Sequence, residues 1–156
     1  MAGRKPTTPS AQRDFLAEVN FTNLSGKGGP EFWAQKSGGD VQAETTKAYD
    51  GGKVFPQTLG GPPSVDDITV TAPYERERDW DLYSSVQAAV GQETADITVR
   101  NGKSSFNSGD VQAQQGGLQY SKALLKSVKG PDVDASSGSA STWSLTFTPN
   151  GAPTVV

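Results

Sequence analysis

The sequence predicts a mainly β domain with one α-helix. Apolar and polar residues alternate over short segments that glycines and prolines separate, which is the pattern of strands joined by turns. The chain of 156 residues has 18 glycines and 10 prolines, a composition typical of β folds with many turns and long loops. Only one segment has helical spacing. The length predicts a single domain, 1–156, with about six or seven strands around a thin core.

The first strand is predicted at 14–21, because alternate residues there are apolar and would share one face. That face carries Phe15, Ala17, Val19 and Phe21. The preceding residues, 1–13, are polar and contain two prolines. They predict an N-terminal arm that is either disordered or ordered against a neighbouring subunit.

A glycine-rich loop is expected at 23–40. Its GKGG sequence is only a fragment of a phosphate-binding loop, since the full GxxxxGK[ST] pattern is absent, so no nucleotide site is predicted. Phe32 and Trp33 are the apolar anchors of this loop. We expect both to pack back onto their own domain. A contact with another subunit is the main alternative, and it makes both residues interface candidates.

Two more strands are expected before the helix. Segment 41–55 alternates loosely, and an Asp-Gly-Gly sequence within it predicts a turn or a bulge. Segment 56–63, PQTLGGPP, predicts a loop because of its glycines and prolines. Segment 65–72 alternates clearly, and Pro73 is expected to end that strand.

One helix is expected at about 76–90, where apolar residues recur at helical spacing and should pack on a sheet. This stripe comprises Leu82, Tyr83, Val86, Ala89 and Val90. Acidic residues cluster near the helix start, where the helix dipole favours negative charge. These residues are Glu75, Glu77, Asp79 and Asp81, and Arg76 and Arg78 are their expected salt-bridge partners. Gly91 is a natural end for the helix.

The second half of the chain predicts further strands and one long excursion. After a strand at 94–100, the residues 101–117 are mostly polar, with Phe106 and Val111 as the only sizeable apolar residues. A polar excursion of this length is uncommon in a compact domain unless it has a function. We therefore predict that 101–117 is a long assembly loop, which orders only between subunits or rings.

The last two strands are predicted at 118–129 and 139–148, and a C-terminal tail at 149–156. In the first of these strands, alternation places four residues on one face, namely Leu118, Tyr120, Leu124 and Val128. In the second, the shared face carries Trp143, Leu145 and Phe147.

The residues predict no catalytic, cofactor-binding or metal site. The chain has no cysteine and no histidine, which excludes disulfides, thiolate metal sites and histidine-dependent nucleophilic catalysis within it. Asp66 and Asp67 would point to opposite faces of a strand and could not form a close acid–base pair. The net charge of −3 disfavours adhesive binding of nucleic acid. No secretory signal and no membrane-spanning run is expected.

The segment 50–100 resembles the middle of bacteriophage tail tube proteins. The matching features are a strand with the run Asp-Ile-Thr-Val at 67–70, Tyr74, the pair Arg78-Asp79 at the helix start, and a glycine after the helix. Ala72 departs from the family, which has a basic residue after the strand, so a ring contact at that position is in doubt. The resemblance makes Tyr74, Arg78 and Asp79 candidates for subunit contacts.

The resemblance implies a β-sandwich or partly rolled barrel flanked by one helix. It also implies six subunits per ring, with rings stacked into a hollow phage tail tube through which DNA passes without specific binding. The expected partners are further copies of the chain and other tail proteins: the tape measure, the tail terminator, and the baseplate or tail tip. The expected location is the virion tail, after assembly in the host cytoplasm, and no membrane is involved.

Two other interpretations remain open. One is a standalone β-sandwich binding or adhesin domain that recognises carbohydrate through Trp33 or Trp143. The other is a related head–tail or tail-terminator ring protein. An enzyme is not expected, because no motif supplies catalytic groups.

Overall fold

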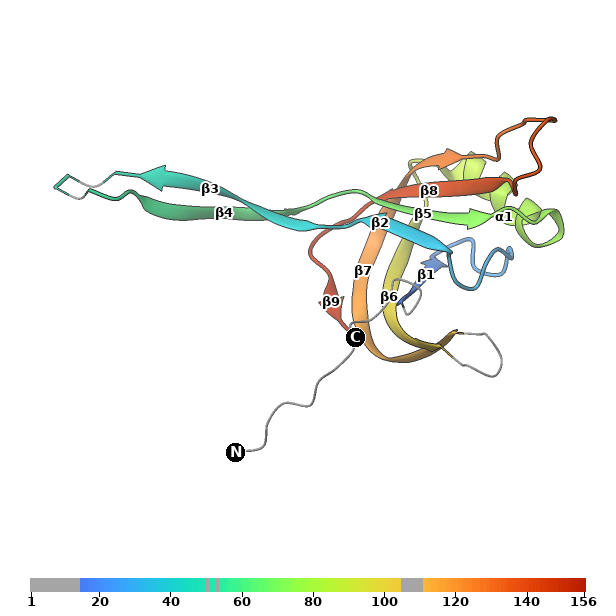
Figure 1. The fold of residues 1–156 in the computed structure, drawn as a ribbon, viewed down its shortest axis with the longest axis horizontal. Helices are drawn as coiled ribbons and strands as arrows, with labels where there is room; N and C mark the ends of the chain where they lie inside the picture. The colour runs from blue at the N-terminus through green and yellow to red at the C-terminus, as the bar shows by residue number, and fades with distance from the viewer. Residues whose placement is uncertain (1–14, 50, 53, 105–110) are drawn as a thin grey trace.

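The computed structural model describes residues 15–49, 51–52, 54–104 and 111–156. In these residues the chain forms a curled β-sheet, a separate two-stranded sheet and one helix (Figure 1). The elements in chain order are β1 (Phe15–Phe21), β2 (Gln35–Gly38), β3 (Val41–Ala48), β4 (Gln57–Val65), β5 (Ile68–Pro73), α1 (Arg76–Ala89), β6 (Thr94–Ser104), β7 (Val111–Lys129), β8 (Thr142–Thr148) and β9 (Thr154–Val155). The predicted mainly β fold with one helix is confirmed.

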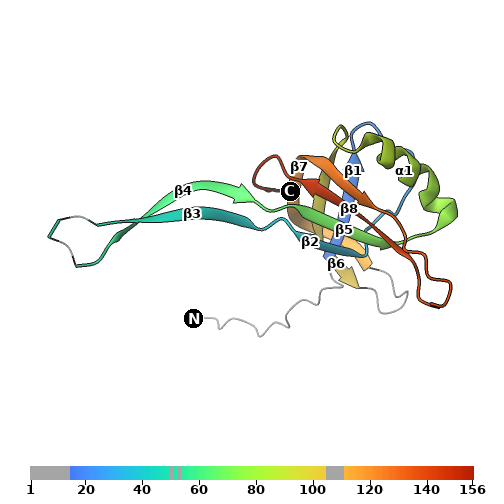
Figure 2. The same ribbon diagram turned by 90° about the horizontal axis from the view of Figure 1, so that it is seen from above.

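The larger sheet has the strand order β1-β6-β7-β8-β5-β2, and β9 pairs with β7 beside this path. All its pairings are antiparallel. The sheet curls until its two end strands, β1 and β2, face each other, so that it resembles a half-closed barrel. The smaller sheet, β3 with β4, extends away from this body as a long ribbon (Figure 2).

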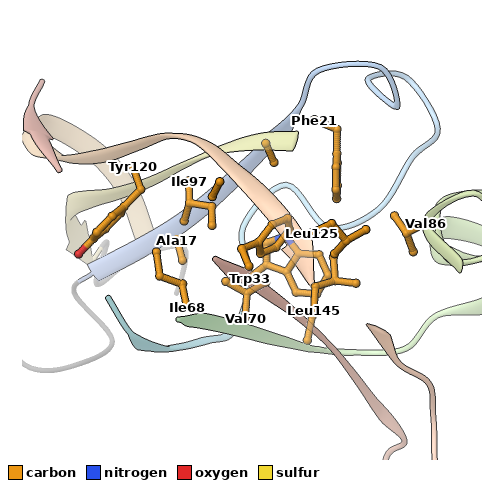
Figure 3. Packing of buried hydrophobic residues seen from close by; sticks show 14 of the residues in the cluster. Ala17, Phe21, Trp33, Ile68, Val70, Val86, Ile97, Tyr120, Leu125 and Leu145 are labelled. Carbon is orange, nitrogen blue, oxygen red and sulfur yellow. The ribbon is translucent and has the colours of Figure 1, made fainter. Parts of the chain in front are cut away.

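The core lies inside the curl, where Ile68, Val70, Ile97 and Leu145 are fully buried. Figure 3 shows these side chains gathered between strands from both halves of the sheet. The helix covers one side of the core with Leu82 and Val86, as the predicted stripe requires. The part of the chain that the structure describes has no helix with both the length and the apolar character needed to cross a bilayer.

The predicted loop at 56–63 is wrong, because most of it belongs to β4. Its prolines are tolerated since a two-stranded ribbon has a free outer edge on each strand, where a missing N–H costs little. The pairing also shifts between Ala43 and Thr45, which oppose Pro63 and Gly60. One extra residue on β4 forms a bulge, and strands accept proline at bulges.

Three further predicted loops contain strands. The 23–40 loop includes β2, and the tail at 149–156 includes β9. The predicted long loop at 101–117 is largely a hairpin, because β6 continues to Ser104, β7 begins at Val111 and these two residues pair. Backbone pairing there does not depend on an alternating apolar face, so the sequence pattern did not indicate it.

The predicted apolar face of β7 is also wrong in part. Tyr120 is buried, but Leu124 is 40% exposed, and Ala123 and Leu125 are fully buried instead. The pairing with β6 shifts at this point, because Ala95 opposes Ala123 whereas Ile97 opposes Tyr120. One extra residue in β7 forms a bulge and reverses which residues face the core.

Candidate assembly surfaces

The ribbon of β3 and β4 is exposed along almost its whole length, and we call it the arm. All eight residues of β3 are exposed, and no residue of β4 is buried. In both ribbon views the arm projects from the body with its far end away from the core (Figures 1 and 2). A two-stranded hairpin without a supporting layer is at best marginally stable in water. The arm is therefore built like a segment that is completed by contact with another molecule.

The far end of the arm carries three large exposed side chains, Tyr49, Val54 and Phe55, which we call the arm tip. Their exposed fractions are 75%, 87% and 82%. Large apolar residues gathered on an exposed surface often mark a site of protein association. The loose alternation over 41–55 predicts that all three lie in a strand, whereas they lie beyond the ends of β3 and β4. The sequence signal for such an exposed tip is an aromatic residue on each side of the Asp-Gly-Gly sequence.

A second surface lies between the two end strands of the curled sheet, and we call it the seam groove. The backbone N–H of Trp33 donates to the carbonyl of Ala17 at 2.8 Å and joins β1 to the segment just before β2. Beside this bridge a groove of about 410 Å³ remains open. It is lined by Phe15, Leu16, Ala17, Trp33, Ala34, Gln35, Lys36, Ser37, Thr69, Thr71 and Val99. Unpaired strand edges on both sides make this a place where another segment can add.

Lys36 and Tyr120 lie together near the β2 wall of this groove. The Lys36 ammonium is 5.6 Å from the centre of the Tyr120 ring and donates to the carbonyl of Gly38 at 2.7 Å. Burial lowers the pKa of Lys36, against the opposing effect of Asp40, and burial together with Asp40 raises the pKa of Tyr120. The Tyr120 hydroxyl donates to the carbonyl of Gly39 at 2.8 Å. These contacts fix the end of β2.

The two apolar anchors of the 23–40 loop, Phe32 and Trp33, differ in burial. Trp33 is only 4% exposed, and its ring centre lies 5.0 Å from that of the buried Trp143. Phe32 is half-buried. The expected packing of Trp33 onto its own domain is confirmed. Because both tryptophans are buried in the core, neither offers an exposed face for stacking on a carbohydrate.

Tyr74 belongs to the same aromatic cluster and is half-buried. The centre of its ring lies 6.2 Å from that of Trp143 and 6.0 Å from that of Tyr83, and both contacts are edge-to-face. Its backbone N–H donates to the carbonyl of Ser141 at 2.9 Å. Edge-to-face contacts of this kind stabilise a core beyond the area that they bury. In this chain Tyr74 therefore joins the helix start to β8.

Arg78 and Asp79 form a lock at the helix start. Asp79 is fully buried, and its carboxylate accepts two hydrogen bonds from the Arg78 guanidinium, from Nε at 2.8 Å and Nη2 at 3.0 Å. It also accepts from the backbone N–H of Glu75 at 2.9 Å. The hydrogen bond to Asp79 raises the pKa of Arg78. Such bidentate charged pairs are strong and directional.

The lock also reaches neighbouring segments. Arg78 Nη2 donates to the carbonyl of Pro73 at 2.9 Å, and the Arg78 carbonyl accepts from the N–H of Gly29 at 3.0 Å. Gly29 has a φ of +98°, and a Cβ there would collide with Leu82. Glycine is the residue that adopts this positive φ without strain and leaves room for the Leu82 side chain. The pair thus ties the helix start to β5 and to the glycine-rich loop.

Two predicted site residues remain, Phe106 and Val111. Val111 is the first residue of β7, opposite Ser104. Phe106 lies outside the described residues. The described residues also contain no group of three or more acidic side chains placed to hold a metal ion. The structure thus brings Trp33, Tyr74, Arg78 and Asp79 together around the helix start and places Val111 in the hairpin.

No family model and no curated protein sequence matches this chain. Solved structures do match it over nearly its full length. A chain from the anti-feeding prophage cap, the AFP tube terminating cap, aligns with TM-score 0.72 and 16% identity, covering 99% of this chain and 95% of that one. A chain from the AFP baseplate, solved with 6-fold symmetry, aligns with TM-score 0.70 and 16% identity, covering 97% of each chain.

A third match comes from an extracellular contractile injection system, the PVC sheath–tube complex in its extended state. It has TM-score 0.68 and 19% identity, and covers 95% of this chain and 91% of that one. At these identities the likeness establishes the fold. The chain therefore shares the fold of subunits found in the cap, baseplate and sheath–tube parts of contractile injection systems.

Proposed function

We propose that this chain is the structural subunit of a tail tube in a phage-like particle. Six copies form a ring, and rings stack into a hollow tube. The observation that carries the proposal is the combination of a near-complete fold match to such assemblies with an arm whose residues are almost all exposed. A freestanding domain gains nothing from such an arm, whereas a subunit gains a contact with its neighbour.

The ring size is supported by the 6-fold symmetry of one matching assembly. In a cyclic assembly, head-to-tail contacts between subunits close into a ring. Exposed strand edges and protruding elements can supply such contacts. This chain has both, in the seam groove and the arm. The hairpin within 101–117 and the terminal segments 1–13 and 149–156 are further proposed contacts between subunits or rings. Phe32, Tyr74 and Val111 remain proposed contact residues, as do Arg78 and Phe106.

The tube serves as a passive conduit. A net charge of −3 suits a surface past which DNA slides without adhesion. The other proposed partners are a tape measure protein, a tail terminator and a baseplate or tail tip, in the virion tail. A role as the ring that terminates the tube is the second candidate, favoured by the match to a tube terminating cap.

Negative-stain electron microscopy of the concentrated protein tests the proposal. The expected images are ring-shaped class averages with sixfold symmetry and a central hole, together with stacks of such rings. Single rings that never stack would favour the terminator role. A solid monomer that persists at high concentration, even with tail initiation proteins added, would refute the tube function and leave a standalone domain.

A further inference from the structure

An apolar row crosses four strands at the open end of the curled sheet. Ala17 of β1 opposes Val99 of β6, Val99 opposes Leu118 of β7, and Leu118 opposes Val155 of β9. Directly opposed residues in an antiparallel sheet point to the same face. We call these four residues the apolar row. It lies next to the buried pair of Ile97 and Tyr120, so it continues the core toward solvent.

The apolar row is covered only at its β1 end. Ala17 is buried beneath Trp33, whereas Leu118 is 42% exposed and Val155 is 84% exposed. Phe15, two residues before Ala17 in the same strand, is 47% exposed. Phe15, Ala17 and Val99 also line the seam groove. The exposed end of the row therefore adjoins the groove through Val99, which pairs with Leu118.

We propose that this surface receives the arm tip of a second copy of the chain. The inference rests on the proposed tube function, because it supplies the contact that joins one subunit to the next. Both features lack a partner in the described structure, and they match in chemistry. The arm tip offers Val54 and Phe55, both apolar and more than four-fifths exposed. The receiving surface offers a groove whose lining includes the apolar residues Phe15, Ala17 and Val99.

Size and reach support this pairing. A dry cavity of about 150 Å³ accommodates a benzene molecule. The seam groove, at about 410 Å³, has room for the Phe55 ring and a neighbouring side chain. The nine residues of β4 span about 30 Å at the usual rise of a strand. The arm carries its tip away from its own body (Figures 1 and 2), so the groove that the tip reaches belongs to another copy.

Cysteine crosslinking tests this docking, and the natural chain has no cysteine to interfere. Protein carrying Phe55→Cys is mixed with protein carrying Leu118→Cys, assembled and oxidised. We expect a covalent dimer containing one copy of each variant. Val133→Cys replaces Phe55→Cys in the matched control, because Val133 is equally apolar and 96% exposed but lies in the loop before β8. The dimer yield should exceed the control by about tenfold or more, because docking raises the effective thiol concentration.

The outcomes separate this inference from the proposed function. Tubes with the crosslink between Phe55→Cys and Leu118→Cys support both. Tubes that form while this pair yields no more dimer than the control overturn the docking and leave the tube function intact, with a different protein covering the surface. Failure to form rings or tubes, with no crosslink, overturns both.

A second variant tests the docking without cysteine chemistry. Phe55→Ser should keep the thermal stability of the free subunit, because the side chain is 82% exposed, and should abolish tube growth. Val133→Ser is the matched control and should assemble normally. Normal tubes from Phe55→Ser would overturn the docking.

Discussion

The backbone N–H of Lys122 donates a hydrogen bond to the Asp96 carboxylate, with 2.9 Å between N and Oδ1. Lys122 has a φ of +50°, in a region that non-glycine residues rarely adopt. It lies in the β7 bulge, beyond which the other set of alternate β7 side chains points toward the core. Asp96 therefore stabilises a strained backbone that determines which β7 residues enter the core.

Replacing Asp96 by alanine should destabilise the domain by about 1–2 kcal/mol, because the bulge loses a hydrogen bond to a charged acceptor at a partly exposed position. Chemical denaturation at neutral pH measures the change. Asp96→Asn is the matched control, since its amide oxygen can still accept the hydrogen bond, and it should cost less. Equal losses in both variants would show that the hydrogen bond does not support the bulge.

Replacing Leu82 by alanine should cost about 2–5 kcal/mol, because the side chain is 2% exposed and its removal leaves a cavity between helix and sheet. Thermal unfolding reports the loss. Val133→Ala removes apolar atoms from a side chain that is 96% exposed and should change stability by less than about 0.5 kcal/mol. An unchanged melting temperature for Leu82→Ala would contradict the packing of the helix on the sheet.

Replacing Arg78 by methionine should destabilise the domain by about 3 kcal/mol, because the fully buried Asp79 carboxylate loses its charged partner. Denaturant unfolding measures the change. Arg76→Met removes the same charge from an exposed position of the same helix and should have little effect. If the two variants behaved alike, net charge rather than the lock would explain the loss.

The Lys126–Asp67 ion pair, at 2.7 Å, should give a small acid-dependent stability. The hydrogen bond from Lys126 lowers the pKa of Asp67 below its usual value. A lowered carboxyl pKa adds stability above the unfolded-state pKa, and this contribution disappears as the pH falls through the folded-state pKa. The effect should therefore decline as the pH falls below about 4 and vanish below the lowered folded-state pKa of Asp67. Both side chains are substantially exposed, so its size should be that of a surface pair.

Lys126→Met should raise the pKa of the Asp67 carboxyl toward its usual value and weaken the acid dependence of unfolding. An NMR titration of the carboxyl carbon follows the pKa directly. Lys129→Met, which removes the same charge from another exposed site on β7, should leave the Asp67 pKa close to that of the parent protein. A pKa unchanged by Lys126→Met would show that the pair does not form in solution.

The elements that sequence could predict are those that bury one side. Strand β5 and strand β8 alternate clearly because Val70 and Leu145 face the core, and the helix follows its stripe of Leu82 and Val86. Gly91 follows the helix with a φ of +84°, as its predicted role at the helix end requires. In each case the apolar pattern and the burial have the same period.

The features that sequence could not predict depend on distant partners. Leu124 and Leu125 are adjacent and chemically alike, and only the bulge held by Asp96 decides which one is buried. The arm has no buried side to leave a pattern, so the glycines and prolines of β4 indicated a loop. The sequence predicts salt bridges between the helix-start acids and Arg76 or Arg78, but the contact of Arg78 with a fully buried Asp79 follows from the fold.

The exposed arm also has a consequence for when assembly occurs. If the arm is stabilised only by a neighbour, a free subunit must lose the conformational entropy of the arm on joining, and two lone subunits gain few contacts in return. A completed ring offers every receiving surface at once and recovers that cost most effectively. Growth would then proceed from a template rather than spontaneously, with a lag phase that preformed rings abolish.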